Sequence, residues 1–208
     1  GDPALAAYVP FTSKDADIFL PDPEMAMAVA AVAGWEFRHS VDEPSPVLGY
    51  ITLERGDKTL TVDVMRRVTG LDHFDLLAID EIKFEDGRTY LLPTPEIMLK
   101  AKLWNVKLHP QERRQDVKHV GMMVACCRHY LADACQAVVA GRLSEAEALL
   151  HFSATRHIIS TPEADGVAQR YGLKLAVALP DWTSLGESPK LKRIRASYTE
   201  EPSPREKP

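Results

Sequence analysis

The sequence predicts an α+β protein, in which a mixed, mainly antiparallel sheet with helices on one face is followed by a helical C-terminal region. Much of the first 92 residues shows the two-residue alternation of strands, and the spacing of apolar residues becomes helical from Pro95 onward. The 208 residues are 45% hydrophobic and 26% charged, which is typical of a globular protein. We therefore expect an α/β core over 1–92, a helical region over 93–185 and a flexible tail over 186–208.

The N-terminal part alternates strands with one helix. A strand over 15–20 ends at Pro21, and a helix over 22–34 has Asp22 as its N-cap and Gly34 at its end. The Gly-Asp pair at 56–57 predicts a hairpin turn, so the strands on either side of it are antiparallel. The further predicted strands lie at 35–41, 47–55 and 58–68, with one or two more within 75–93.

Three helical segments follow. The first begins at Pro95 and runs through Trp104, and a long one extends from about Pro110 to about Ala140. Ser144 is the expected N-cap of the next, and the chain beyond it to Pro180 is helical, with interruptions at T-P-E-A-D-G and Y-G. Pro, Ser and charged residues dominate 186–208, which favours little regular structure there.

Charge and cysteine content restrict the function. With a net charge of -5, any site for a polyanion must be a local basic patch. No apolar run reaches the roughly 18 residues of a membrane span, and Asp2 near the start does not suit a signal peptide. Cys126, Cys127 and Cys135 lack metal-ligand spacing, which indicates reduced, buried thiols. These features predict a cytoplasmic protein that is not bound to a membrane.

Three aspartates are the strongest chemical signal. Asp15 and Asp17 are two residues apart on a predicted strand, so both carboxylates point to one face. Asp63 lies in the middle of another strand, where aspartate is unfavourable. Each feature alone is more often a solvated surface group. If the two strands are neighbours, however, the carboxylates converge and suit Mg²⁺ or Mn²⁺, as two-metal phosphoryl transfer requires.

The segment G-D-P-A-L-A-A-Y-x3-T-S-K-D-A-D-I resembles the first motif of the nucleotidyltransferase superfamily. It is most similar to the DNA polymerase beta-like minimal nucleotidyltransferases and to the AbiEii-type toxins. Asp63 matches the third acidic position of that superfamily. Further along, L-P-T-P-E-I-M-L-K-A-K-L and R-R-Q-D-V-K-H resemble its helical segment, which carries a lysine and then a basic residue before an aspartate.

This resemblance implies a nucleotidyltransferase-like fold that transfers a nucleoside monophosphate from an NTP to a hydroxyl of RNA, a protein or a small molecule, releasing pyrophosphate. Mg²⁺ or Mn²⁺ is the implied cofactor. The implied catalytic and metal-binding residues are Asp15, Asp17 and Asp63. The implied nucleotide-binding residues are Gly1, Ser13, Lys100, Lys102 and Asp116.

Two of these assignments have alternatives. Lys100 and Lys102 are about 200° apart on a helix, so we expect only one of them to face the implied nucleotide-binding cleft. Asp116 supports the lysine according to the resemblance, but it also stands three residues after Arg113, the spacing of a helical ion pair. A further basic set is either a guide for a polyanion such as tRNA or an ordinary helix surface. It comprises Lys107, Arg113, Arg114 and Lys118.

The sequence departs from the superfamily in the first motif. Asp2 stands where a small residue normally approaches the triphosphate, and Pro10 and Phe11 replace the usual arginine. The alternative to an enzyme is therefore a catalytically degenerate fold that binds a nucleotide or a protein partner, for example in a toxin–antitoxin pair. A phosphohydrolase using the same carboxylates is a third possibility, and it would release phosphate instead of pyrophosphate.

Overall fold

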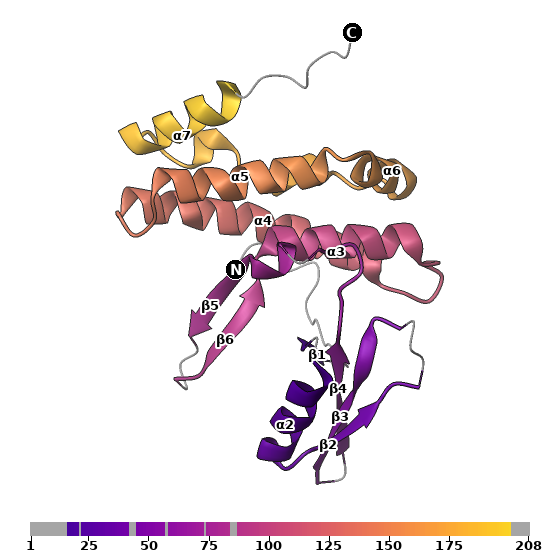
Figure 1. The fold of residues 1–208 in the computed structure, drawn as a ribbon. Helices are drawn as coiled ribbons and strands as arrows, with labels where there is room; N and C mark the ends of the chain where they lie inside the picture. The colour runs from indigo at the N-terminus through magenta and orange to yellow at the C-terminus, as the bar shows by residue number, and fades with distance from the viewer. Residues whose placement is uncertain are drawn as a thin grey trace. The chain divides into compact units, whose positions relative to one another are not determined.

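The computed structural model describes residues 16–20, 22–41, 45–56, 58–72, 74–83 and 87–200 (Figure 1). These fall into two compact units, one ending at residue 72 and the other beginning at residue 74. The sequence places the boundary after residue 92 instead. The difference arises because the strands within 75–93 form a sheet of their own and do not join the first sheet. The α+β class is confirmed.

The first unit contains a four-stranded sheet in the order β1-β4-β3-β2. Its strands are β1 (Ala16–Phe19), β2 (Glu36–His39), β3 (Val47–Arg55) and β4 (Lys58–Met65). β1 pairs with β4 in parallel, whereas the pairs β4–β3 and β3–β2 are antiparallel. The prediction of a mixed, mainly antiparallel sheet is therefore confirmed for the described strands.

Helix α2 (Pro23–Ala33) has the predicted ends. The side chain of Asp22 accepts a hydrogen bond from the Glu24 backbone N–H at 2.8 Å, which satisfies one of the free donors of the first turn. Gly34 ends the helix with a φ of +70°, a conformation that glycine adopts without strain. Local sequence signals therefore determine this helix.

One face of the four-stranded sheet packs against α2. The small side chains of Ala26 and Ala30 let the helix approach closely, and the buried sheet residues opposite include Ile51 and Val64. On the same face, a Cβ added to Gly49 would lie 2.6 Å from the ring of Phe37, so this position needs glycine. The face covered by α2 is thus the apolar one, and residues of opposite parity form the other face.

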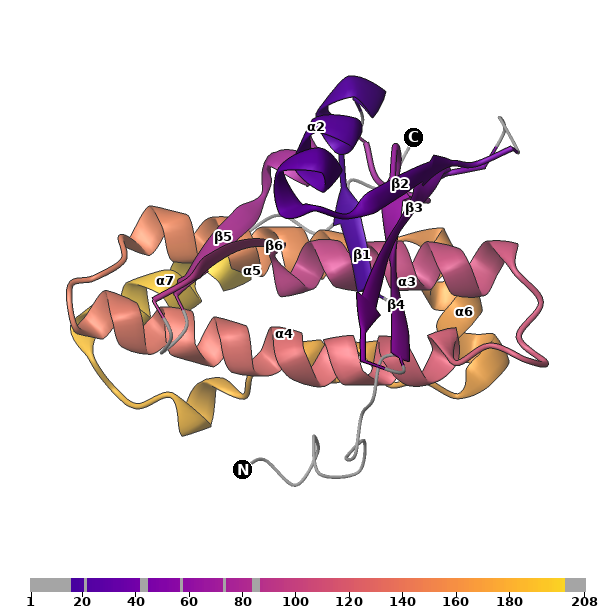
Figure 2. The same ribbon diagram turned by 90° about the horizontal axis from the view of Figure 1, so that it is seen from below.

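The second unit begins with a short 3-10 helix, η1 (Asp75–Leu77), and the antiparallel strands β5 (Ile79–Lys83) and β6 (Thr89–Pro93). The α-helices that follow are α3 (Pro95–Leu108), α4 (Asp116–Val139), α5 (Glu145–Ile159), α6 (Pro162–Tyr171) and α7 (Pro189–Glu200). Two more 3-10 helices, η2 (Leu175–Ala178) and η3 (Trp182–Ser184), precede α7. Helix α4 lies beside α3 and α5 in Figure 1 and Figure 2.

Helix boundaries differ from the predictions in three places. Helix α3 continues to Leu108, beyond the predicted end at Trp104. Helix α4 starts at Asp116 and not near Pro110, because a turn closed by the Arg114 N–H and the Gln111 carbonyl precedes it. The segment T-P-E-A-D-G does not interrupt a helix but begins α6, since the hydroxyl of its threonine caps the Ala164 N–H.

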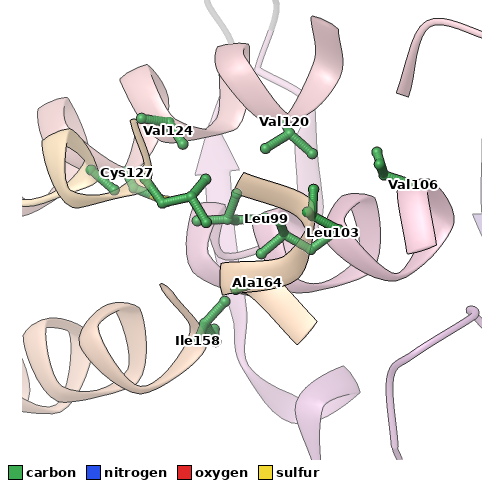
Figure 3. Packing of buried hydrophobic residues seen from close by; sticks show 11 residues of the cluster. Leu99, Leu103, Val106, Val120, Val124, Cys127, Ile158 and Ala164 are labelled. Carbon is green, nitrogen blue, oxygen red and sulfur yellow. The ribbon is translucent and has the colours of Figure 1, made fainter. Parts of the chain in front are cut away.

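Two apolar clusters hold the helices together. One joins α3, α4, α5 and α6 through residues that include Leu99, Leu103, Val120 and Ile158 (Figure 3). The other joins α4, α5 and α7 around the fully buried Phe152.

The expectation of an irregular tail from residue 186 is wrong for 189–200, which form α7. Its Leu191, Ile194 and Tyr198 are buried against the second cluster. The spacing of three and then four residues puts them on one helix face, so α7 is held by packing despite its polar composition. The ring of Phe152 is 5.5 Å from that of Tyr198 and stacks on Trp182 at 4.9 Å.

The three cysteines are free, and Cys127 and Cys135 are buried as expected, while Cys126 is half-buried. Burial raises the pKa of Cys135 to about 11, so its thiol stays protonated at neutral pH. Within the described ranges, no helix combines the length and the apolar content of a membrane span.

Candidate functional site

Asp17 and Asp63 occupy matching positions on the parallel strands β1 and β4. Neighbouring strands lie about 4.8 Å apart, and residues in register on them point to the same face. Ile18 and Val64, each next in sequence, belong to the core under α2, so the two aspartates lie on the opposite face. The expectation that these two strands are neighbours is confirmed, and their register pairs Asp17 with Asp63.

Residues in register with these two aspartates on the neighbouring strands form a row across the sheet. Asp63 is opposite Tyr50 on β3, and Tyr50 is opposite Arg38 on β2. The guanidinium of Arg38 donates two 3.0 Å hydrogen bonds to the Glu36 carboxylate on the same strand. The row therefore contains two carboxylates, the ring of Tyr50 and the guanidinium of Arg38, which is already paired with Glu36.

The donor set of the two aspartates fits a hard divalent cation. Like charges directly opposite on adjacent strands destabilise a sheet, and a cation between them would reverse this effect. Mg²⁺ prefers carboxylate oxygens and is commonly held by one or two of them together with substrate phosphates. Asp15, the third predicted ligand, lies outside the described residues, as do Gly1 and Ser13. In the part of the chain that is described, no three His, Cys, Asp or Glu residues gather into a metal site.

The two predicted lysines of α3 have different environments. Lys100 donates to both oxygens of Asp75, at 2.9 and 2.7 Å, and this pair is largely buried. Lys102 is close enough to Asp116 and His119, at the start of α4, to affect the titration of both. The helix geometry thus separates the lysines as expected, and of the two only Lys102 contributes to lowering the pKa of Asp116.

Asp116 is a buried carboxylate at the first position of α4. Burial alone would raise its pKa, but the hydrogen bond and charge of Arg114, helped by Gln111 and Lys102, hold the pKa below its usual value. The ion pair of Asp116 is with Arg114, two residues before it, so the suggested pair with Arg113 is wrong. The carboxylate is anionic and stabilises the cations around it.

Burial and the charge of Lys102 lower the pKa of the neighbouring His119, so its imidazole is neutral near pH 7. The start of α4 therefore combines a buried anion, a neutral imidazole and two cations.

The other basic residues of the helical unit are partly engaged. Lys107 pairs with Glu163 at 3.2 Å and lies over the Trp104 ring at 4.4 Å. Arg113 and Lys118 are exposed. Both the polyanion guide and the ordinary helix surface remain compatible with this arrangement.

A shallow cleft of about 270 Å³ lies between α3 and α6. Among its lining residues are Lys107, Glu163, Arg170 and Tyr171. Of the predicted site residues that lie in the described part of the chain, none lines this cleft, so it does not locate the predicted chemistry.

The sequence did not point to a partly buried hydrogen-bonded group of polar side chains in the second unit. The Nδ1 of His151 on α5 is 2.7 Å from Oε1 of Glu96 on α3, and its Nε2 is 3.3 Å from the hydroxyl of Tyr130 on α4. The hydrogen bond with Glu96 raises the pKa of His151 despite the opposing effect of burial. The three residues are far apart in sequence and form no motif, so only tertiary structure reveals them.

No protein-family model, curated protein or solved structure matches this chain.

Proposed function

We propose that the chain is a Mg²⁺-dependent nucleotidyltransferase that transfers a nucleoside monophosphate from an NTP to an acceptor hydroxyl and releases pyrophosphate. The observation that carries the proposal is the register of Asp17 opposite Asp63 on parallel strands, on the face away from α2. Two carboxylates so placed, with no apolar layer of α2 over them, are an arrangement suited to a divalent cation and a phosphate chain.

In this proposal Asp17 and Asp63, with Asp15, hold Mg²⁺ or Mn²⁺, which when bound neutralises charge on the α-phosphate and the leaving pyrophosphate. Asp63 also accepts the proton of the attacking hydroxyl. Catalysis then depends mainly on positioning and charge neutralisation.

Lys102 is the better candidate than Lys100 for the triphosphate. Lys100 is already bound by both carboxylate oxygens of Asp75, and a phosphate would have to displace them. The charge of Lys102 helps to lower the pKa of Asp116, whose ion pair is with Arg114. In the proposal Asp116 orients Lys102 and does not itself contact the nucleotide. Gly1 and Ser13 retain their implied phosphate contacts.

The acceptor is a hydroxyl of RNA such as tRNA, of a protein or of a small molecule. Three unpaired cysteines fit a reducing, cytoplasmic setting.

The test is incubation of the full chain with Mg²⁺ and each NTP radiolabelled at the α-phosphate, with a tRNA pool and with the chain itself as acceptors. We expect labelled acceptor and pyrophosphate, and a loss of at least about 100-fold in Asp63→Ala. Glu54→Gln is the matched control, since Glu54 lies on the same face but stands opposite Thr59 and not opposite an acid. Unchanged label transfer in Asp63→Ala removes the metal role from this residue.

A thermal shift separates a protein that binds an NTP from a fold that binds only a protein partner, and label transfer then separates the enzyme from a degenerate fold that binds a nucleotide. A Mg²⁺-dependent shift with an NTP that is lost in Asp17→Asn supports metal-assisted NTP binding at this residue. No shift with any NTP supports a fold whose role is to bind a protein partner such as an antitoxin. Release of phosphate in place of pyrophosphate would indicate a phosphohydrolase.

A further inference from the structure

The hairpin of β5 and β6 exposes a large apolar surface for its size. In the described part of the chain it is a sheet of two strands, a size that is marginally stable in water by itself. Leu91 is 63% exposed, and Tyr90 and Leu92 are 44% and 42% exposed. Isolated exposed leucines are common, but three consecutive apolar residues on one strand call for an explanation.

The two strands differ in charge. β5 carries Asp80, Glu81 and Lys83, whereas β6 carries no charged residue from Thr89 to Pro93. Charged residues on an edge strand discourage pairing with another strand, so β5 is protected in this way and β6 is not.

The ladder shows which backbone groups of β6 point away from β5. The Thr94 N–H donates to the Ala78 carbonyl at 3.1 Å, directly after the register pair of Ile79 and Pro93. Antiparallel pairs alternate between hydrogen-bonded and non-hydrogen-bonded. Tyr90 and Leu92 therefore bond to β5, and the backbone N–H and carbonyl of Leu91 point to the outer edge.

We propose that the outer edge of β6 is a dimer interface, where β6 of a second copy of this chain pairs antiparallel about a twofold axis at Leu91. Leu91 then stands opposite its own copy, and each exchanges an N–H to carbonyl hydrogen bond with the other. The Thr89 N–H donates to the Pro93 carbonyl of the second copy. Because Pro93 has no N–H, it cannot donate a hydrogen bond back to the Thr89 carbonyl, and this is the one bond lost at each end of the pairing.

Side-chain chemistry favours this pairing over the alternative one. Tyr90 would stand opposite Leu92 of the second copy, an aromatic–aliphatic pair of the kind that stabilises sheets. The same twofold pairing of β5 would place Glu81 opposite Glu81, which is repulsive. The charge pattern therefore selects β6, and the product is a four-stranded sheet with β5 on both outer edges.

The test is the mass of the full chain in solution, measured by sedimentation velocity over a wide range of concentrations. We expect a dimer for the wild type and a monomer for Leu91→Lys, which places two like charges at the axis. Leu150→Lys is the matched control, because Leu150 is 69% exposed on α5, and it should remain dimeric. Far-UV circular dichroism shows that each variant is folded.

A second measurement needs no variant. Hydrogen exchange at the outward Leu91 amide should slow as the wild-type concentration rises, while the Tyr90 and Leu92 amides, already bonded to β5, change less. A monomer at every concentration, or a dimer that persists in Leu91→Lys with concentration-independent exchange at Leu91, overturns the proposal.

Discussion

Replacing Asp17 by asparagine should stabilise the metal-free protein and remove its response to Mg²⁺. Asp17 is exposed and stands in register with Asp63, so the two negative charges lie on one face of the sheet. The asparagine side chain would keep nearly the same volume and one carbonyl oxygen while removing this repulsion. A purely structural surface aspartate would show neither effect.

The strand spacing sets the size of the effect. Two unit charges about 4.8 Å apart repel by about 0.9 kcal/mol at the dielectric constant of water and by about 3.5 kcal/mol at an effective value of 20. Asp17 is exposed and Asp63 is half-buried, and salt screens the pair, so the lower value applies. Charged side chains that face each other on neighbouring strands typically change the free energy of unfolding by about 0.2–1 kcal/mol. We therefore expect a gain of about 0.5–1 kcal/mol in the free energy of unfolding, or about 1–4 °C in Tm.

The assay is thermal or urea unfolding in EDTA at low salt, repeated at high salt and with Mg²⁺. Asp17→Asn should be more stable than wild type in EDTA, with the difference shrinking at high salt. Added Mg²⁺ should stabilise wild type and leave the variant nearly unchanged. Glu54→Gln is the control, because it removes one charge from the same face where the opposite residue is Thr59. It should show no gain in EDTA.

Two results would refute this reasoning. A loss of stability for Asp17→Asn in EDTA would mean that the carboxylate already makes a favourable interaction and that repulsion is not the dominant effect. Equal stabilisation of both proteins by Mg²⁺ would mean that the ion binds elsewhere.

The remaining predictions concern the packing and the partly buried polar group of Glu96, His151 and Tyr130. Glu96 raises the pKa of His151 above 6.5, its value in an unfolded chain. The pair therefore stabilises the folded protein fully below about pH 6.5, and this contribution is lost as the pH rises through the folded pKa. Urea unfolding at a series of pH values should show this loss of stability in wild type but not in His151→Gln. Ile194→Lys should release α7 and lower the free energy of unfolding by several kcal/mol, roughly 3–5, and an unchanged midpoint in urea would argue against docking of this helix. Gly49→Ala should reduce the stability of the first unit by about 1–3 kcal/mol because its Cβ meets the Phe37 ring. A Tm equal to that of the wild type would contradict the close approach of Phe37 to Gly49.

Local chemistry made much of the fold predictable. Asp22 and Gly34 terminate α2, and Ser144 begins α5 with a capping box, as their types and positions indicate. Alternating residues likewise locate β3 and β4 on either side of the turn at Gly56. Such signals act within a few residues, so the sequence alone is enough to predict these helix ends, turns and strands.

The candidate site was predictable in part for the same reason. Alternation along a strand assigns a face to Asp17 and to Asp63 separately. Whether β1 pairs with β4, and in which register, depends on contacts between segments more than forty residues apart, and tertiary structure supplied this. The environments of Lys100 and Lys102 were also settled only by their neighbours from other segments.

Helix α7 and the chain formed by Glu96, His151 and Tyr130 show what sequence by itself does not determine. The polar composition of 189–200 favours an irregular tail, and the helix forms because Ile194 and its neighbours are buried against α4 and α5. Glu96 and His151 are 55 residues apart and meet because α3 and α5 pack together. Caps, turns and strand periodicity are properties of neighbouring residues, whereas burial and long-range pairing arise only when distant segments come together, and that is the part tertiary structure decided.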